Sequence, residues 1–196
     1  AGFMTILHGD ARFYNNIFVQ QEIRDDLTAF AQSIGKNRMD GFQFICGTKP
    51  YDGYPTPEEY FGRFGLDAAE DRGNRDIYYD HLPVATGGNV YFNGAQPCDM
   101  EKGCKVDSEH TVALKLEEEN GKWRLNTNLY EYLPKFETQV ISTEILGEAF
   151  EPEQKFEAPD GTPILFNQDY FGLKRDAVMP LAGPFAYGCE AEKELA

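Results

Sequence analysis

The sequence of 196 residues lacks the signatures of several protein classes. It contains no run near the ~18 apolar residues that cross a membrane, no glycine-rich phosphate loop and no G-x-S-x-G motif. Basic residues are scarce, because 18 Lys and Arg stand against 33 Asp and Glu, for a net charge of −15. That charge repels nucleic-acid backbones and anionic lipid surfaces. We therefore expect no nucleic-acid partner and no membrane partner.

The start of the chain lacks the features of a signal peptide. The segment "AGFMTILHGD" has no basic region, which favours a soluble protein that is cytoplasmic rather than secreted. The chain also begins without an initiator Met and already inside an apolar run, as a fragment of a longer protein would. For a fragment, the missing signal peptide would say nothing about export.

Cysteine is sparse, and its spacing does not fit a zinc site. The four cysteines, Cys46, Cys98, Cys104 and Cys189, include no C-x2-C pair. Cys98 and Cys104 could close a small disulfide loop in an oxidising compartment, whereas reduced thiols are the simpler expectation for a chain this large. His81 and His110 show no ligand spacing either. We expect no metal ion and no cofactor.

Aromatic residues are abundant, with 15 Phe and 11 Tyr against 1 Trp and 4 Met. This bias favours pleated sheet over a helical bundle, and the length fits one large domain or two small ones. We therefore predict a mainly β protein. The expected early elements are strands at residues 3–7, 12–20, 41–47 and 89–94, a helix over 24–35, a short helix capped by Thr56, Pro57 and Glu59, and a charged loop over 67–81.

The clearest local pattern is a hairpin around Asn120-Gly121. Apolar and polar residues alternate on both sides of this dipeptide, over residues 112–117 and 123–129. Both residues tolerate the positive φ of a type I′ turn. The alternation predicts one buried face and one solvent-facing face.

Farther along, a strand is expected over residues 138–147, a turn at Pro159-Asp160-Gly161 and a strand over 163–166. Short strands separated by turns, without βαβ alternation, indicate a sandwich or another antiparallel sheet.

Several aromatic side chains are candidates for sugar stacking. Trp123 could stack on a sugar ring, but its place in the alternation favours packing in the core. Tyr51, Tyr54 and Tyr60 cluster in "YDGYPTPEEY" and could form an aromatic rim, although a packed loop is the simpler interpretation.

Two asparagines, Asn15 and Asn16, interrupt the apolar stretch "HGDARFYNNIFVQ" (8–20), although strands disfavour Asn. In a right-handed parallel β-helix, turn asparagines of neighbouring coils can stack, because each amide both donates and accepts hydrogen bonds. The stretch "NVYFNG" (89–94) has the same character and would be a neighbouring coil. The alternative is an ordinary loop at Asn15-Asn16.

Three longer stretches carry a family resemblance: "GDARFYNNIFVQ", "LPVATGGNVYFNGAQP" and "EAFEPEQKFEAPDGTPILFNQDYFGLKR", the last followed by "GPF". Together they resemble the C-terminal part of glycoside hydrolase family 120 and related β-helix glycosidases, chiefly β-xylosidases, over about residues 8–186. The resemblance implies coils of a right-handed parallel β-helix combined with an antiparallel β-sandwich. The corresponding organisation is coils with a helical or loop insertion in 1–105, a sandwich-like region in 106–188 and a frayed tail in 189–196.

The resemblance also implies where the chemistry lies. In that family the nucleophilic Asp and the acid/base Glu precede the coil that resembles "GDARFYNNIF". This chain is therefore expected to be a C-terminal fragment that completes the helix of a xylo-oligosaccharide hydrolase and is not catalytic alone. Its partners would be the remainder of the parent chain, carbohydrate, and a further copy in a homo-oligomer. The alternative is a non-catalytic carbohydrate-binding or structural β-sandwich module.

Three polar residues, His8, Asp10 and Arg12, stand at the head of the stretch 12–20. Alternating positions in a strand point to one side, so this cluster could bind substrate hydroxyls. The alternative is an Asp10–Arg12 pair that fixes the bend between coils. A catalytic pair cannot be chosen among 33 acidic residues, because glycosidases require two carboxyl groups at a defined separation.

Overall fold

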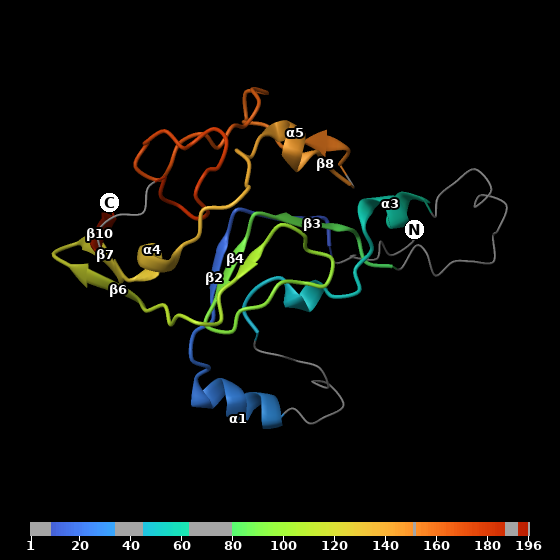
Figure 1. Ribbon diagram of the computed structural model, residues 1–196. Helices are drawn as coiled ribbons and strands as arrows, with labels where there is room; N and C mark the ends of the chain where they lie inside the picture. The colour runs from blue at the N-terminus through green and yellow to red at the C-terminus, as the bar shows by residue number, and fades with distance from the viewer. Residues whose placement is uncertain (1–8, 34–44, 63–79, 151, 187–191, 196) are drawn as a thin grey trace.

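The structure is a computed structural model that describes residues 9–33, 45–62, 80–150, 152–186 and 192–195 (Figure 1). Within these ranges the chain is mainly β, with short helices and small open sheets. The predicted strand 3–7, most of the predicted strand 41–47 and nearly all of the predicted loop 67–81 lie outside the described residues. No helix within the described ranges is long and apolar enough to cross a bilayer.

Short parallel strands form the centre of the molecule (Figure 1). The strand β1 (Ala11–Tyr14) pairs with β3 (Val84–Gly87). The next strand, β2 (Ile17–Val19), pairs with β4 (Val90–Phe92), which also pairs with β5 (Lys105–Val106). The prediction that "NVYFNG" neighbours "RFYNNIFV" is therefore confirmed.

The predicted continuous strand 12–20 is wrong, because Asn15 and Asn16 separate β1 from β2. Asn15 has φ +54°, in the left-handed region that Asn enters more readily than other non-glycine residues. Its side-chain amide donates to the carbonyl oxygen of Gln139 at 2.8 Å. The chain therefore bends here and starts a second sheet.

The core lies around β4, all of whose residues are buried. Phe92 is 0% exposed and clusters with Val19, Val112, Leu129 and Ala182. On the neighbouring register position the ring of Phe18 stacks on Tyr91, with 5.0 Å between centroids and 13° between planes. The core therefore joins the parallel strands to residues from later in the chain.

The early helices follow the prediction. The helix α1 (Asp25–Ser33) projects away from the parallel sheets in Figure 1, and its Leu27 and Phe30 are exposed. The helix α3 (Pro57–Gly62) begins with a reciprocal capping box: the Thr56 N–H donates to Glu59 Oε2 at 2.9 Å, and the Glu59 N–H donates to Thr56 Oγ1 at 3.2 Å. The 3₁₀ turn η1 (Lys49–Tyr51) precedes α3.

The predicted hairpin is present, but its predicted buried face is buried only at the end far from the turn, at Val112, Thr127 and Leu129. The strands β6 (Leu114–Glu119) and β7 (Lys122–Thr127) are antiparallel, and Asn120 and Gly121 have φ of +54° and +76°. Every residue of β6 is exposed. Leu116, at 54% exposed, shows that alternation alone does not bury a face.

The predicted fraying of the tail is wrong for residues 192–195. They form β10 (Glu192–Leu195), which pairs antiparallel with β7. The edge of β7 offers unpaired backbone groups, and an added strand satisfies them.

Short turns replace the strand predicted over 138–147. After α4 (Leu129–Tyr132), residues Thr143–Leu146 form the single helical turn α5, which Gly147 ends at φ +70°. The strands β8 (Glu148–Ala149) and β9 (Gln154–Lys155) then pair antiparallel.

The predicted strand 163–166 appears only as isolated pairings. Pro163 pairs with Glu157 and Leu165 with Ser142. The predicted turn is present, with Gly161 at φ +80° and the Thr162 N–H donating to Asp160 Oδ1 at 3.0 Å. The sandwich predicted for residues 106–188 stays a prediction.

Candidate functional site

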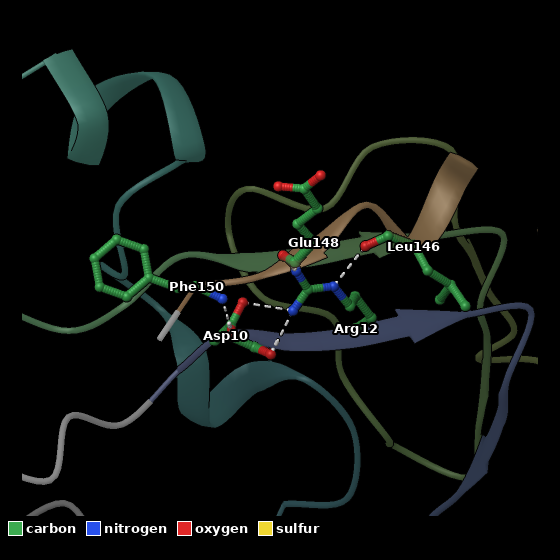
Figure 2. A network of polar contacts seen from close by, with 5 residues as sticks. All are labelled: Asp10, Arg12, Leu146, Glu148 and Phe150. Atoms are coloured by element: carbon green, nitrogen blue, oxygen red, sulfur yellow. Dashed lines mark hydrogen bonds and ion pairs between the residues drawn. The ribbon is translucent and has the colours of Figure 1, made fainter. Parts of the chain in front are cut away.

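The predicted polar cluster at the head of β1 is a clamp on a distant segment (Figure 2). Arg12 Nε donates to the carbonyl oxygen of Leu146 at 2.7 Å, and Nη2 donates to that of Glu148 at 2.5 Å. The remaining group, Nη1, donates to the main-chain oxygen of Asp10 at 2.6 Å and to its Oδ1 at 2.5 Å. The guanidinium also lies over the Phe156 ring, 4.6 Å from its centroid.

Asp10 completes the clamp from the other side. Its Oδ2 accepts a hydrogen bond from the Phe150 N–H at 2.8 Å (Figure 2). The Asp10 N–H donates to the Pro83 carbonyl oxygen at 2.7 Å. Asp10 has φ +53°, so the chain turns sharply into β1. Main-chain groups thus form most of the hydrogen bonds that Asp10 and Arg12 can make. These contacts favour the alternative in which the pair fixes the course of the chain. His8 lies outside the described residues.

A second polar cluster is buried between the parallel strands and was not predicted. Glu101 Oε2 accepts hydrogen bonds from Tyr91 Oη at 2.6 Å and from Thr48 Oγ1 at 2.8 Å. Glu101 Oε1 accepts one from Asn89 Nδ2 at 2.7 Å. Burial raises the pKa of the Tyr91 hydroxyl, and the hydrogen bond to Glu101 raises it further, so this hydroxyl remains a proton donor.

Asn89 connects this cluster to the preceding strand pair. Its Oδ1 accepts from the Asn16 N–H at 2.8 Å and from Asn16 Nδ2 at 3.1 Å, while its Nδ2 also donates to the Phe13 carbonyl oxygen at 2.8 Å. The predicted contact between turn asparagines of neighbouring strands is thereby confirmed. The repeated Asn-x-aromatic pattern of residues 16–18 and 89–91 was its signal, whereas nothing in the sequence singled out Glu101.

Tyr14 borders three hollows in the surface. A hollow of about 740 Å³ with a mixed polar and apolar lining lies between β1–β3 and residues 137–139, and its wall includes Gly87, Lys102 and Glu137. A more apolar hollow of about 660 Å³ lies between β1–β2 and residues 140–184. A third, of about 290 Å³, lies beside the Asp10–Arg12 clamp. Burial raises the pKa of the Tyr14 hydroxyl, and the charge of Arg12 opposes that shift.

The two larger hollows do not contain a pair of carboxylates suited to glycoside hydrolysis among their described lining residues. Among the described residues that line the 740 Å³ hollow, Glu137 is the one carboxylate, and the described lining of the 660 Å³ hollow contains none. Asp10 and Glu148 both line the smallest hollow, but Asp10 is already held by Arg12 and Phe150.

Among the aromatic side chains considered for sugar stacking, Trp123 differs from its prediction, whereas the tyrosines agree with theirs. Trp123 is 43% exposed, so its predicted core packing is wrong. Tyr60 is buried, and Tyr54 stacks on His81 with 4.1 Å between centroids. The rings of Tyr51 and Tyr54 are nearly perpendicular, at 83°, as in a packed loop.

Neither a disulfide nor a metal cluster is found among the described residues. Cys46, Cys98 and Cys104 are free thiols, and Cys189 lies outside the described residues. No three His, Cys, Asp or Glu side chains within the described ranges converge as metal ligands would.

The arrangement of strands is shared with a known protein. No family profile and no curated protein sequence matches the chain. A solved structure, that of XylC in complex with xylose, superposes with a TM-score of 0.70 and 25% sequence identity. This chain is structurally similar to XylC. The match covers 95% of this chain and 26% of XylC, so the chain spans about a quarter of the length of XylC.

Proposed function

We propose that this chain is the C-terminal part of a xylosidase-like glycoside hydrolase of the family 120 type, in which it completes a right-handed parallel β-helix. The observation that carries the proposal is the structural similarity to XylC, a protein solved with xylose, over 95% of this chain. The resemblance of three sequence stretches to that family points in the same direction.

Two features of the fold support the β-helix. The strands β2, β4 and β5 are short and parallel, and they lie side by side in the sequence in which the chain forms them, as successive coils would. The Asn16–Asn89 contact and the Phe18–Tyr91 stack repeat the same side-chain type at the same register position. The sandwich-like region of residues 106–188 belongs to the same proposal.

In this proposal the catalytic acids come from the remainder of the parent chain. The two larger hollows offer no pair of carboxylates among their described lining residues, and a glycosidase needs two. The role of Asp10 and Arg12 is to hold residues 146–150 against β1. Direct contact of His8, Asp10 and Arg12 with substrate stays a prediction.

The test is hydrolysis of an aryl β-xyloside by the 196-residue chain and by its parent protein. We expect xylose release by the parent and none by the chain alone. Turnover by the chain alone would overturn the proposal that its catalytic acids lie elsewhere. A parent reading frame without further short strands and paired acidic residues would overturn the β-helix hydrolase itself.

A carbohydrate-binding module is the second candidate, and the exposure of Trp123 favours it. Such a module needs several exposed, coplanar aromatic rings on one face. Tyr60 is buried and the Tyr51 and Tyr54 rings are perpendicular, so Trp123 lacks the predicted companions. Loss of xylan binding in a Trp123→Ala variant would support this candidate, and unchanged binding would remove it.

A further inference from the structure

Gly87 is a glycine that the backbone does not require. It ends β3 without a positive φ, and glycine within a strand weakens the strand relative to a residue with a side chain. The next residue, Gly88, is different, because its φ is +68° and an added Cβ would collide with Asn15 Oδ1. The position of Gly87 therefore calls for another explanation.

The surroundings of Gly87 supply one. A Cβ at this position would lie 3.5 Å from Cδ1 and Cε1 of the Tyr14 ring, its register partner on β1. Both residues line the 740 Å³ hollow, so a larger side chain at Gly87 would cover the ring and occupy the hollow. A strand glycine of this kind often marks a place where a ligand approaches closely.

The polar groups around the hollow are available to a ligand. The Tyr14 hydroxyl, the Lys102 ammonium and the Glu137 carboxylate have no hydrogen-bond or ion-pair partner among the described residues, although all three line the hollow. The wall beside them is fixed, because Thr138 Oγ1 donates to the Pro180 carbonyl oxygen at 2.7 Å. One cation and one anion leave the rim without net charge.

These features match a neutral, hydroxylated ligand rather than an ion. An aromatic ring offers an apolar face, and a few convergent donors and acceptors set the orientation of what binds there. The volume lies within the ~300–1,000 Å³ range of ligand pockets. Lys102 can donate to sugar hydroxyls, Glu137 can accept from them, and Tyr14 can do both.

We propose that the hollow between Tyr14, Gly87, Lys102 and Glu137 binds a neutral pyranose sugar, with one face of the sugar on the Tyr14 ring. The choice of a xylose unit as that sugar rests on the proposed function. The hydroxyl groups of the bound sugar would point toward Lys102 and Glu137 at the rim of the hollow.

The test is titration of the 196-residue chain with xylobiose, followed by isothermal calorimetry or by NMR shifts. Gly87→Leu fills the hollow and should weaken binding about tenfold or more, a difference in binding that either method resolves. Gly62→Leu is the matched control, since nothing lies within 4 Å of a Cβ at that position, and it should bind as the unchanged chain does. Equal affinity of the Gly87→Leu variant and the unchanged chain would overturn the site.

Two rim variants keep the test valid if Gly87→Leu fails to fold. Lys102 and Glu137 are exposed, so Lys102→Met and Glu137→Gln should leave the melting temperature unchanged while each weakens binding several-fold. Tyr14→Phe should bind more tightly than Tyr14→Ala, because it keeps the ring. Full binding by both rim variants, or by Tyr14→Ala, would overturn the proposal.

A second sugar separates this site from the proposed function. Binding of xylobiose in preference to maltose supports both. Equal binding of the two disaccharides, lost in Gly87→Leu, supports a pyranose site and contradicts its assignment to xylose. No binding of either overturns the site, whereas the xyloside assay on the parent protein tests the hydrolase independently.

Discussion

The parallel strands and the β6–β7 hairpin differ in sequence pattern and in burial: β2 and β4 are continuous runs of aliphatic and aromatic residues, whereas apolar and polar residues alternate in the hairpin. Phe92 on β4 is 0% exposed, and its strand has parallel partners on both sides. Leu116 on β6 is 54% exposed, and every other residue of that strand is exposed as well. A packed core therefore maintains the first region, whereas the turn at Asn120-Gly121 and backbone pairing with β10 maintain the second.

Polar contacts deepen the contrast. In the parallel region, buried amides and Glu101 connect strands that are far apart in the sequence. In the hairpin, polar contacts such as Lys115–Glu117 join exposed side chains, and exposed ion pairs contribute little to stability. Substitutions in the two regions should therefore have very different effects on the free energy of unfolding.

The largest difference is expected between Phe92→Ala and Leu116→Ala. Removal of a fully buried ring leaves a cavity, so Phe92→Ala should lower the free energy of unfolding by about 3–5 kcal/mol. Leu116→Ala should change it by less than about 0.5 kcal/mol, because the side chain is already in water. Urea denaturation measures both. Equal losses would mean that the hairpin face is covered.

The second difference compares two asparagines. Asn89→Ala leaves Glu101 Oε1, the Phe13 carbonyl and the Asn16 amide without a partner and should cost about 3 kcal/mol. Asn126→Ala removes an exposed hydrogen bond to Glu117 and should cost less than about 0.5 kcal/mol. Thermal unfolding of both variants gives the comparison. A neutral Asn89→Ala would show that the buried cluster is not structural.

The third prediction concerns the clamp that holds residues 146–150 against β1. Arg12→Met keeps much of the side-chain volume but leaves the carbonyl groups of Leu146 and Glu148 without their donor, at a cost of about 2 kcal/mol. Arg124→Met, on the exposed hairpin, is the matched control and should be nearly neutral. Faster proteolysis of residues 146–150 in Arg12→Met would show that the segment is released. Unchanged protection would contradict the clamp.

The smallest effect is expected in the hairpin turn. Gly121→Val places a β-branched residue at φ +76° and should cost about 1–2 kcal/mol. Lys122→Val, on the adjacent strand position, should be tolerated because Val favours strands. An unchanged melting temperature for Gly121→Val would count against the type I′ turn.

Local signals in the sequence were sufficient for elements that depend on neighbouring residues. The capping box of Thr56 and Glu59 and the turn at Asn120-Gly121 are of this kind, since the interacting atoms lie within a few residues. It was also predictable that residues 16–18 and 89–91 lie side by side, because both segments have the pattern Asn-x-aromatic.

Features that depend on distant packing were not predictable. The exposure of Trp123 depends on whether another layer covers the hairpin, and alternation does not specify one. The single helical turn α5 lies where a strand was predicted, because the Thr143 N–H donates to the Ile164 carbonyl oxygen and Gly147 ends the turn. Likewise, the sequence indicated that Asp10 and Arg12 lie close together. It did not indicate that the Arg12 guanidinium donates to the carbonyl oxygens of Leu146 and Glu148.

Hydrogen exchange of backbone amides tests most directly whether the parallel strands are the stable unit of this chain. The Val90 N–H donates to the Asn16 carbonyl oxygen and the Asp107 N–H to that of Tyr91, so both should exchange only when the whole molecule unfolds. The amides of the β6–β7 hairpin should exchange faster, through local opening. Hairpin amides more protected than Val90 would contradict the account.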